Sequence, residues 1–183
     1  QCLYEARNIL KKEKAFAVTM GDLISLPGES LIGELKEIYL KHKIPVISVE
    51  KIDRQKSKQY GIIDPQKRKG RIHFIKSIVE KPEPALAPSE YAMTGKYILT
   101  PKIFDYLGVL LKNRKNNEEI KLANALRDYA KVHDLYGYEC KSRHFDTGTK
   151  LDLVKAEVVF ALNHPEIGPL VRSALKSLIK IGN

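Results

Sequence analysis

The sequence predicts an α/β fold, in which helices pack on a layered β-sheet. Apolar residues recur with helical spacing over 3–12 and again over 31–42. Each of these segments leads, within a few residues, into a short apolar run typical of a buried strand, at 15–20 and at 45–49. Alternation of helices and buried strands through short connections favours parallel strands within one sheet.

The boundaries of the next elements carry their own signals. Ser30 stands where its hydroxyl group can cap the helix over 31–42. Further along, the segments 60–64 and 71–75 flank a polar stretch rich in Pro, Gly, Lys and Arg. This pattern predicts a β-hairpin with basic residues at its turn.

The remaining elements follow the same alternation of helix and strand. Residues 91–99 predict a strand, and Pro101 suits the first turn of a helix that runs to about Leu111. A polar linker, a helix, a strand and two final helices follow, at 113–117, 119–131, 135–140 and beyond Thr149. The sequence contains no internal repeat and no low-complexity tract.

The length and composition are those of one globular domain, residues 1–183. With 183 residues, of which 43% are hydrophobic, the chain can bury a sizeable core. Charged residues make up 30% of the chain, and no apolar run approaches the roughly 18 to 20 residues that cross a bilayer. This excludes a membrane span. Cys2 and Cys140 lie far apart and lack the spacing of a zinc site, which favours a reducing, cytoplasmic setting.

The formal net charge of +10 is compatible with nucleic acid, an anionic surface or a phosphate-bearing small substrate. Most of this charge is spread along the chain. The densest basic cluster, at 67–71, falls at the predicted hairpin turn and has no interleaved aromatic residues. We therefore expect a solvated hairpin tip and disfavour a nucleic-acid partner.

A carboxylate and an ammonium group stand side by side in the segment Ile78–Pro82. An apolar run delivers Glu80 and Lys81, Pro82 ends the strand, and Gly95 belongs to the next strand. Together, the Glu80 carboxylate and the Lys81 ammonium group could bind a sugar phosphate. The alternative is an ordinary surface charge pair at the end of a strand, which contributes little to stability.

Five motifs, in this order, resemble those of the bacterial UTP–glucose-1-phosphate uridylyltransferases: Gly21-Asp22, Tyr60-Gly61, Val79-Glu80-Lys81-Pro82, Thr94-Gly95-Lys96-Tyr97-Ile98-Leu99 and Phe145-Asp146-Thr147-Gly148. The resemblance implies a Rossmann-like nucleotidyltransferase fold with three layers. Its sheet would be mixed but mostly parallel, with a β-hairpin insertion and C-terminal helices. Residues 1–183 would form a single domain that corresponds to the C-terminal two-thirds of the family fold.

The resemblance also implies an activity and its residues. The enzyme would transfer UMP from UTP to glucose 1-phosphate, giving UDP-glucose and pyrophosphate, with Mg²⁺ as cofactor. Asp22 and Asp146 match the metal-binding positions, and Asp22 and Lys81 would be the catalytic residues. The positions that match the substrate-binding residues are Gly61, Glu80, Lys81 and Gly95.

Each of these positions also has a plain structural interpretation. Asp22 could be an ordinary turn aspartate after a strand, because Gly-Asp is common in turns. Asp146 could belong to a turn that leads into a helix capped by Thr149. Gly61 and Gly95 could be bulge residues without a ligand.

The sequence departs from the family pattern in two places. The glycine-rich nucleotide loop of the family, Gly-x-Gly-Thr-Arg, is not among these residues. We therefore expect residues 1–183 alone to have little activity. We also expect the strand at 15–20 to have an open edge and the chain to form homo-oligomers or to pair with an N-terminal piece. In addition, Lys121, Ala123 and Asn124 stand where the family usually has Gln, Thr and Asp.

These departures leave other functions open. The substitutions near Lys121 affect the expected sugar more than the expected reaction, so another sugar 1-phosphate, or dTTP in place of UTP, is the nearest alternative. A noncatalytic domain that binds a sugar nucleotide is a second alternative. A basic nucleic-acid binder rests on the net charge alone.

Overall fold

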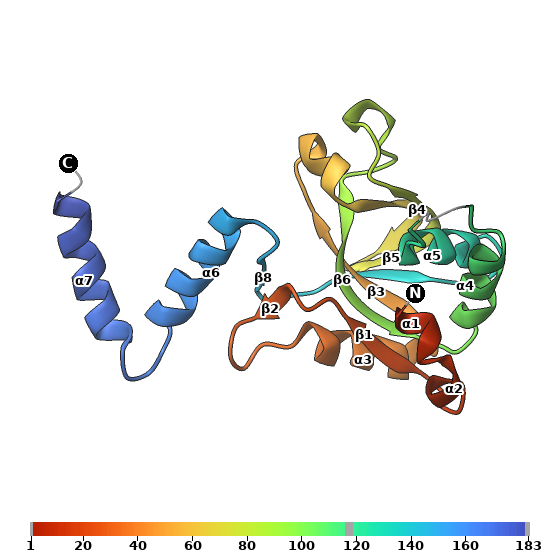
Figure 1. Ribbon diagram of the computed structural model, residues 1–183, viewed down its shortest axis with the longest axis horizontal. Helices are drawn as coiled ribbons and strands as arrows, with labels where there is room; N and C mark the ends of the chain where they lie inside the picture. The colour runs from red at the N-terminus through yellow and green to blue at the C-terminus, as the bar shows by residue number, and fades with distance from the viewer. Residues whose placement is uncertain (1, 116–118, 182–183) are drawn as a thin grey trace. The chain divides into compact units, whose positions relative to one another are not determined.

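A computed structural model of the chain describes residues 2–115 and 119–181 (Figure 1). These residues form two compact units. The larger unit contains residues up to 20 together with 30–141, and the smaller unit contains 21–29 together with the residues from 142 onward.

The larger unit is built on a six-stranded sheet with the order β1-β6-β3-β7-β5-β4. In chain order the strands are β1 (Phe16–Thr19), β3 (Val46–Lys51), β4 (Gly61–Lys69), β5 (Ile72–Glu80), β6 (Tyr91–Leu99) and β7 (Tyr136–Glu139). Its helices are α1 (Cys2–Glu5), α2 (Arg7–Leu10), α3 (Leu31–His42), α4 (Ile103–Lys112) and α5 (Leu122–Ala130), with short 3₁₀ turns η1 (Arg54–Gln59) and η2 (Pro84–Leu86). The predicted α/β class with a mixed sheet is confirmed.

The prediction that most strand pairs are parallel is wrong for this sheet. Among the described strands, only β3 and β7 pair in parallel. The reason is the place of β6, which runs antiparallel between β1 and β3 and hydrogen-bonds to both. The alternation of helix and strand correctly indicated that β1 and β3 point the same way, but it could not indicate that a later strand separates them.

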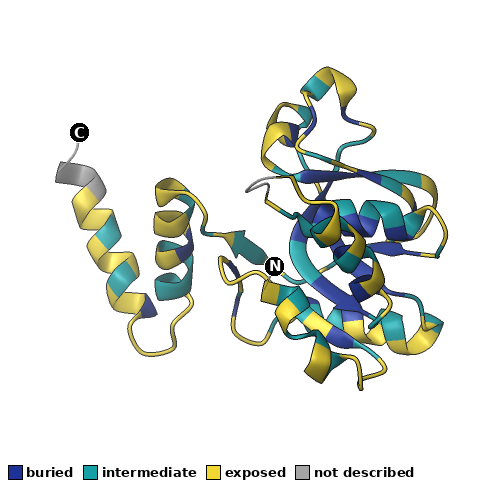
Figure 2. Ribbon diagram, turned by 45° about the vertical axis from the view of Figure 1, so that its right-hand side comes forward, coloured by how far each residue is buried: buried dark blue, intermediate teal, exposed yellow. Residues whose placement is uncertain are grey.

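Helices cover both faces of this sheet, so the three predicted layers are present. Adjacent residues of β3 point to opposite faces, as the twofold repeat of a strand requires. Val46 packs with Leu35 of α3, whereas Ile47 joins the larger cluster that α4 and α5 cover. Figure 2 shows the buried residues concentrated in the sheet and on the inward sides of these helices.

Most of the predicted helices begin close to the expected residues. The predicted cap of α3 is present, since the Ser30 hydroxyl accepts a hydrogen bond from the Gly33 N–H at 3.0 Å. The helix expected over 3–12 is divided into α1 and α2. The linker predicted at 113–117 falls partly outside the described residues, and α5 begins at Leu122, a few residues later than expected.

The predicted hairpin is formed by β4 and β5, which pair antiparallel from Gly61 and Glu80 to the turn. β4 extends further toward the tip than expected, to Lys69, whereas β5 extends further away from the tip, to Glu80. Gly70 makes the turn with a φ of 60°, which an L side chain adopts only with strain. The basic cluster at 67–71 is exposed, as predicted. Part of its charge is used within the chain, because Arg68 lies 2.8 Å from Glu139.

The smaller unit consists of a two-stranded sheet and two helices. The strands β2 (Leu23–Ser25) and β8 (His144–Asp146) pair antiparallel, and the helices are α6 (Lys150–Leu162) and α7 (Gly168–Ile181). Thr149 caps α6, since its hydroxyl accepts a hydrogen bond from the Asp152 N–H at 3.1 Å. Across the described part of both units, every helix is too short or too polar to cross a membrane.

Candidate functional site

The open end of the β4–β5 hairpin brings Gly61, Glu80 and Lys81 together. Gly61 is the first residue of β4 and lies directly opposite Glu80, the last residue of β5. Lys81 then leaves the sheet with a φ of 50°, a left-handed conformation that is costly for a residue with a Cβ atom. Its N–H donates a hydrogen bond to the Tyr60 carbonyl at 2.9 Å, which holds this backbone in place.

A hydrogen bond from a buried side chain holds the turn that follows Lys81. Pro82 cannot donate a ladder hydrogen bond and is buried. Its carbonyl accepts a hydrogen bond from the buried Ser57 hydroxyl at 2.9 Å. The turn is therefore held on both sides of Lys81, whose own side chain is exposed to solvent.

Gly61 leaves room for the Glu80 carboxylate. A Cβ atom at position 61 would lie 2.5 Å from Met93 Cε and 3.1 Å from Glu80 Oε2. Both atoms are at the ends of flexible side chains, so an alanine would displace them instead of straining the backbone. The Glu80 carboxylate can therefore lie close to the backbone of Gly61 because residue 61 has no side chain.

The other carboxylate oxygen of Glu80 faces Lys121. Lys121 Nζ lies 3.3 Å from Glu80 Oε1, and the two side chains are 35% and 20% exposed. Lys121 immediately precedes α5 and is far from Glu80 in the chain. Sequence reasoning identified Lys121 only as a departure from the family pattern. The contact itself has no local signal, because packing of α5 against the sheet creates it.

Gly95 occupies a bulge of β6. It has a φ of 78°, and its carbonyl accepts a hydrogen bond from the Met20 N–H at 2.9 Å. A Cβ atom there would lie 2.8 Å from Met20 Cγ. The register between β3 and β6 shifts at this point, and the Ser48 hydroxyl donates to the Lys96 carbonyl across the shift. Gly95 therefore allows a close approach of chain to chain at a bulge, and no sugar is needed to explain it.

The two predicted metal ligands lie in the smaller unit and face one point. A Cβ atom at Gly148 would lie 3.0 Å from Asp146 Oδ1 and 3.9 Å from Asp22 Oδ2. The backbone that carries them is fixed, since both the N–H and the hydroxyl of Thr147 donate to the Asp22 carbonyl at 2.8 Å. Both aspartates are exposed. Within the described ranges no group of three His, Cys, Asp or Glu side chains could hold a metal ion, but Mg²⁺ commonly uses one or two carboxylates together with substrate phosphates.

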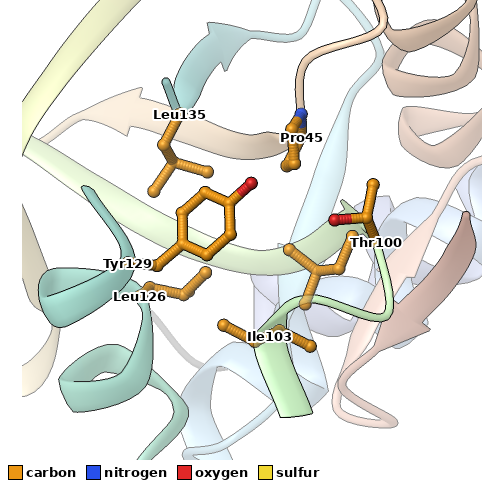
Figure 3. A pocket seen from close by; sticks show the side chains of 7 residues that line it. Pro45, Thr100, Ile103, Leu126, Tyr129 and Leu135 are labelled. Atoms are coloured by element: carbon orange, nitrogen blue, oxygen red, sulfur yellow. The ribbon is translucent and has the colours of Figure 1, made fainter. Parts of the chain in front are cut away.

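An apolar recess on the larger unit is part of the core. Figure 3 shows its side chains gathered around the Tyr129 ring. It has no space for a water molecule and is lined by Pro45, Leu99, Thr100, Ile103, Leu126, Tyr129 and Leu135. Burial raises the pKa of Tyr129 above its usual value, although a hydrogen bond to Thr100 opposes this change. The recess is therefore a closely packed part of the core and not a ligand site.

A buried histidine that sequence reasoning did not assign pairs with an acid on β7. His73 is 1% exposed, and its Nε2 lies 2.7 Å from Glu139 Oε1. The same Glu139 oxygen also forms an ion pair with Arg68, whose Nη2 lies 2.8 Å away. His73 Nδ1 is the one buried side-chain nitrogen or oxygen without a hydrogen-bond partner among the described residues. This cluster lies toward the hairpin tip, at the other end of β5 from Glu80.

Comparison with known proteins gives a consistent result. The nucleotidyl transferase family matches residues 1–161. A UTP–glucose-1-phosphate uridylyltransferase of Staphylococcus epidermidis is 32% identical over 96% of this chain and 60% of its own length. A second such protein, from Staphylococcus saprophyticus, is 36% identical over 87% of this chain and 54% of its own length. The chain thus spans about 60% or less of the length of these two curated relatives.

Solved structures of related proteins share the fold. A UDP-glucose pyrophosphorylase from Acinetobacter baumannii aligns with a TM-score of 0.82 and 26% identity, over 96% of this chain and 60% of that one. A UDP-glucose pyrophosphorylase complexed with UDP-glucose aligns with a TM-score of 0.79 and 26% identity, over 88% of this chain and 61% of that one.

Proposed function

The chain belongs to the nucleotidyl transferase family, and we propose that it takes part in UTP–glucose-1-phosphate uridylyl transfer. The observation that carries this proposal is the arrangement at the open end of the β4–β5 hairpin. There a carboxylate and an ammonium group leave adjacent residues of one strand end, beside a glycine that has no side chain to block them. The names of the curated relatives support the same reaction.

The proposed reaction transfers a uridylyl group between two phosphates. An oxygen of the glucose 1-phosphate monoester attacks the α-phosphorus of UTP. The new P–O bond gives UDP-glucose, and the bond to the departing pyrophosphate breaks. Such a transfer depends on alignment and on neutralisation of charge more than on acid-base groups.

The residues of the hairpin end have distinct roles in this proposal. Lys81 pairs with the phosphate of the acceptor as a compact positive charge and is, with Asp22, a catalytic residue. Glu80 accepts hydrogen bonds from sugar hydroxyl groups. Gly61 is proposed as a substrate-binding position because its lack of a side chain leaves room for the Glu80 carboxylate. Gly95 is proposed as a further substrate-binding position because it matches that position in the family resemblance, whereas the bulge of β6 already accounts for its left-handed backbone.

The residues also fit the Mg²⁺ that members of this family use. Asp22 and Asp146 would hold it, because their carboxylates converge beside Gly148, where a side chain would intrude. Bound Mg²⁺ would neutralise phosphate charge and polarise the P–O bonds. The Thr147 hydrogen bonds keep the two aspartates on adjoining strand ends, whether or not the ion is bound.

Several broader features belong to the same proposal. Both compact units would form part of one nucleotidyltransferase domain, since the family match extends across both. The free Cys2 and Cys140 suit the reducing cytoplasm. The edge strand β1 pairs only with β6 among the described strands, which supports association with a second copy or with another chain.

A related function is favoured by one specific contact. The ion pair between Glu80 and Lys121 changes the expected sugar-binding residues, so the acceptor could be a sugar 1-phosphate other than glucose 1-phosphate. The reaction type would be the same. Comparison of glucose, galactose and mannose 1-phosphates as ligands separates the two functions.

Calorimetry of UDP-glucose binding in the presence of Mg²⁺ tests the proposed function. We expect binding to the wild-type chain and its loss in Lys81→Ala and in Asp22→Ala. Lys131→Ala is a matched control, because Lys131 is an exposed lysine in an ion pair with Asp128. Absence of binding by a folded wild-type chain would instead support a scaffold role.

A further inference from the structure

Lys121 stands at a position that the stability of α5 does not explain. It is the N-cap residue of that helix, with an extended backbone and no capping hydrogen bond from its side chain. Ser, Thr, Asp and Asn are the favoured residues there, and a positive charge is unfavourable beside the N-terminus of a helix. Helix capping therefore does not account for a lysine at position 121.

The ion pair with Glu80 accounts for this lysine only in small part. Both side chains retain contact with solvent, at 35% and 20% exposure. Pairs of this kind contribute little net stability, because water screens them and two long side chains lose freedom. The pair does restrain the carboxylate, since Oε1 faces Lys121 while Oε2 lies over Gly61.

The pair also changes which groups the hairpin end can bind. A carboxylate can only accept hydrogen bonds, whereas an ammonium group has three N–H donors. With Glu80 Oε1 beside Lys121 Nζ, an acceptor and a donor are held 3.3 Å apart. Two adjacent hydroxyl groups of a sugar ring offer the complementary pattern, because one can donate to Glu80 while its neighbour accepts from Lys121.

We propose that Lys121 is a specificity-determining residue that, together with Glu80, binds two neighbouring hydroxyl groups of the sugar 1-phosphate. The acceptor is then a hexose 1-phosphate with adjacent free hydroxyl groups, and hexoses that lack one of them or carry it acylated bind more weakly. This inference rests on the proposed function, since it concerns the same sugar site. It assigns a binding role to a residue that departs from the family pattern.

Binding of a set of deoxy sugars tests the inference. Glucose 1-phosphate and its 2-, 3-, 4- and 6-deoxy analogues are titrated by calorimetry into wild-type chain, Lys121→Met and Glu80→Gln. Lys121→Met keeps most of the apolar length of the side chain and removes its donors. Lys131→Met is the matched control, because Lys131 forms an exposed ion pair with Asp128.

The inference predicts a specific pattern across these ligands. Lys121→Met weakens glucose 1-phosphate binding about tenfold, as expected for one hydrogen bond to a charged group. One deoxy analogue binds wild type and Lys121→Met equally, because it lacks the hydroxyl group that Lys121 contacts. The analogue that is insensitive to Glu80→Gln lacks the adjacent hydroxyl group. Lys131→Met leaves every affinity unchanged.

Other outcomes overturn the inference and are distinct from one another. If Lys121→Met weakens all ligands equally, Lys121 has a structural role only. If it changes no affinity while wild type binds glucose 1-phosphate, the inference fails and the proposed function stands. If the folded wild-type chain binds none of these sugar phosphates, the proposed function fails as well.

Discussion

Gly61 and Glu80 face each other across the last pair of the β4–β5 ladder, and Glu80 Oε2 lies 3.1 Å from the point that a Cβ atom of residue 61 would occupy. The backbone of β4 at Gly61 therefore determines how much space the Glu80 carboxylate of β5 has. It also makes the position of the carboxylate sensitive to a single methyl group.

We expect Gly61→Ala to weaken sugar 1-phosphate binding about tenfold, with a change in unfolding free energy below about 1 kcal/mol. The added Cβ atom displaces Glu80 Oε2 and Met93 Cε, which can both move. Calorimetry and urea denaturation measure the two quantities. Unchanged affinity for a ligand that wild type binds would show that the carboxylate position does not matter.

The aspartate pair should bind a divalent cation. Mn²⁺, titrated with detection by electron paramagnetic resonance, should bind wild type and should bind Asp22→Asn and Asp146→Asn at least tenfold more weakly, because each variant loses one charged oxygen ligand. Asp105→Asn serves as the control, since Asp105 is exposed and pairs with Lys102. Equal binding by all four proteins would remove the aspartates from the metal site.

Loss of Glu139 should destabilise the larger unit. Glu139→Ala removes the partner of both His73 and Arg68, and leaves the buried ring of His73 with no hydrogen bond. We expect a loss of about 1 to 3 kcal/mol in the free energy of unfolding. Glu83→Ala, which breaks an exposed pair with Lys58, should cost less than about 1 kcal/mol. Similar values from urea denaturation of both variants would contradict this difference.

The thiol of Cys140 should make stability depend on pH in the alkaline range. Burial, and the nearby Glu34 carboxylate, raise the pKa of Cys140 from 9.0 to about 12. Between these values the folded chain retains a proton that the unfolded chain has lost, so the free energy of unfolding falls as pH rises. Cys140→Ala should reduce this slope between pH 9 and 11, and an identical slope in both proteins would contradict the assignment.

The same burial should separate the reactivity of the two cysteines. Cys2 is exposed and Cys140 is partly buried. At pH 8 a disulfide reagent such as dithionitrobenzoate should label Cys2 in the folded chain and Cys140 only after denaturation, because the thiolate is the reactive form. Equal labelling of both in the folded chain would contradict the raised pKa.

Much of the fold could be predicted because its signals are local. The hydroxyl of Ser30 and the helical spacing after it define α3, and the polar turn around Gly70 defines the hairpin. The neighbours of β6 could not be predicted, because pairing between β1 and residues 96–99 is determined by packing across the whole sheet. The short strand β2 was missed, since three residues carry too little pattern.

The candidate residues divide in the same way. Glu80 and Lys81 could be found because they are adjacent in the sequence and stand at a strand end that Pro82 marks. Lys121 could be identified only as an unusual residue. Its contact with Glu80 depends on α5 packing against β5, and no spacing in the sequence encodes that contact.

The central claim is that the end of the β4–β5 hairpin binds a sugar 1-phosphate through Lys81. Titration of glucose 1-phosphate followed by its ³¹P resonance tests this directly, because the signal reports on the phosphate itself. We predict a saturable shift with wild type and with Lys131→Met, and its loss with Lys81→Met. A folded wild-type chain that leaves the resonance unchanged, or an equal shift with Lys81→Met, would contradict the claim.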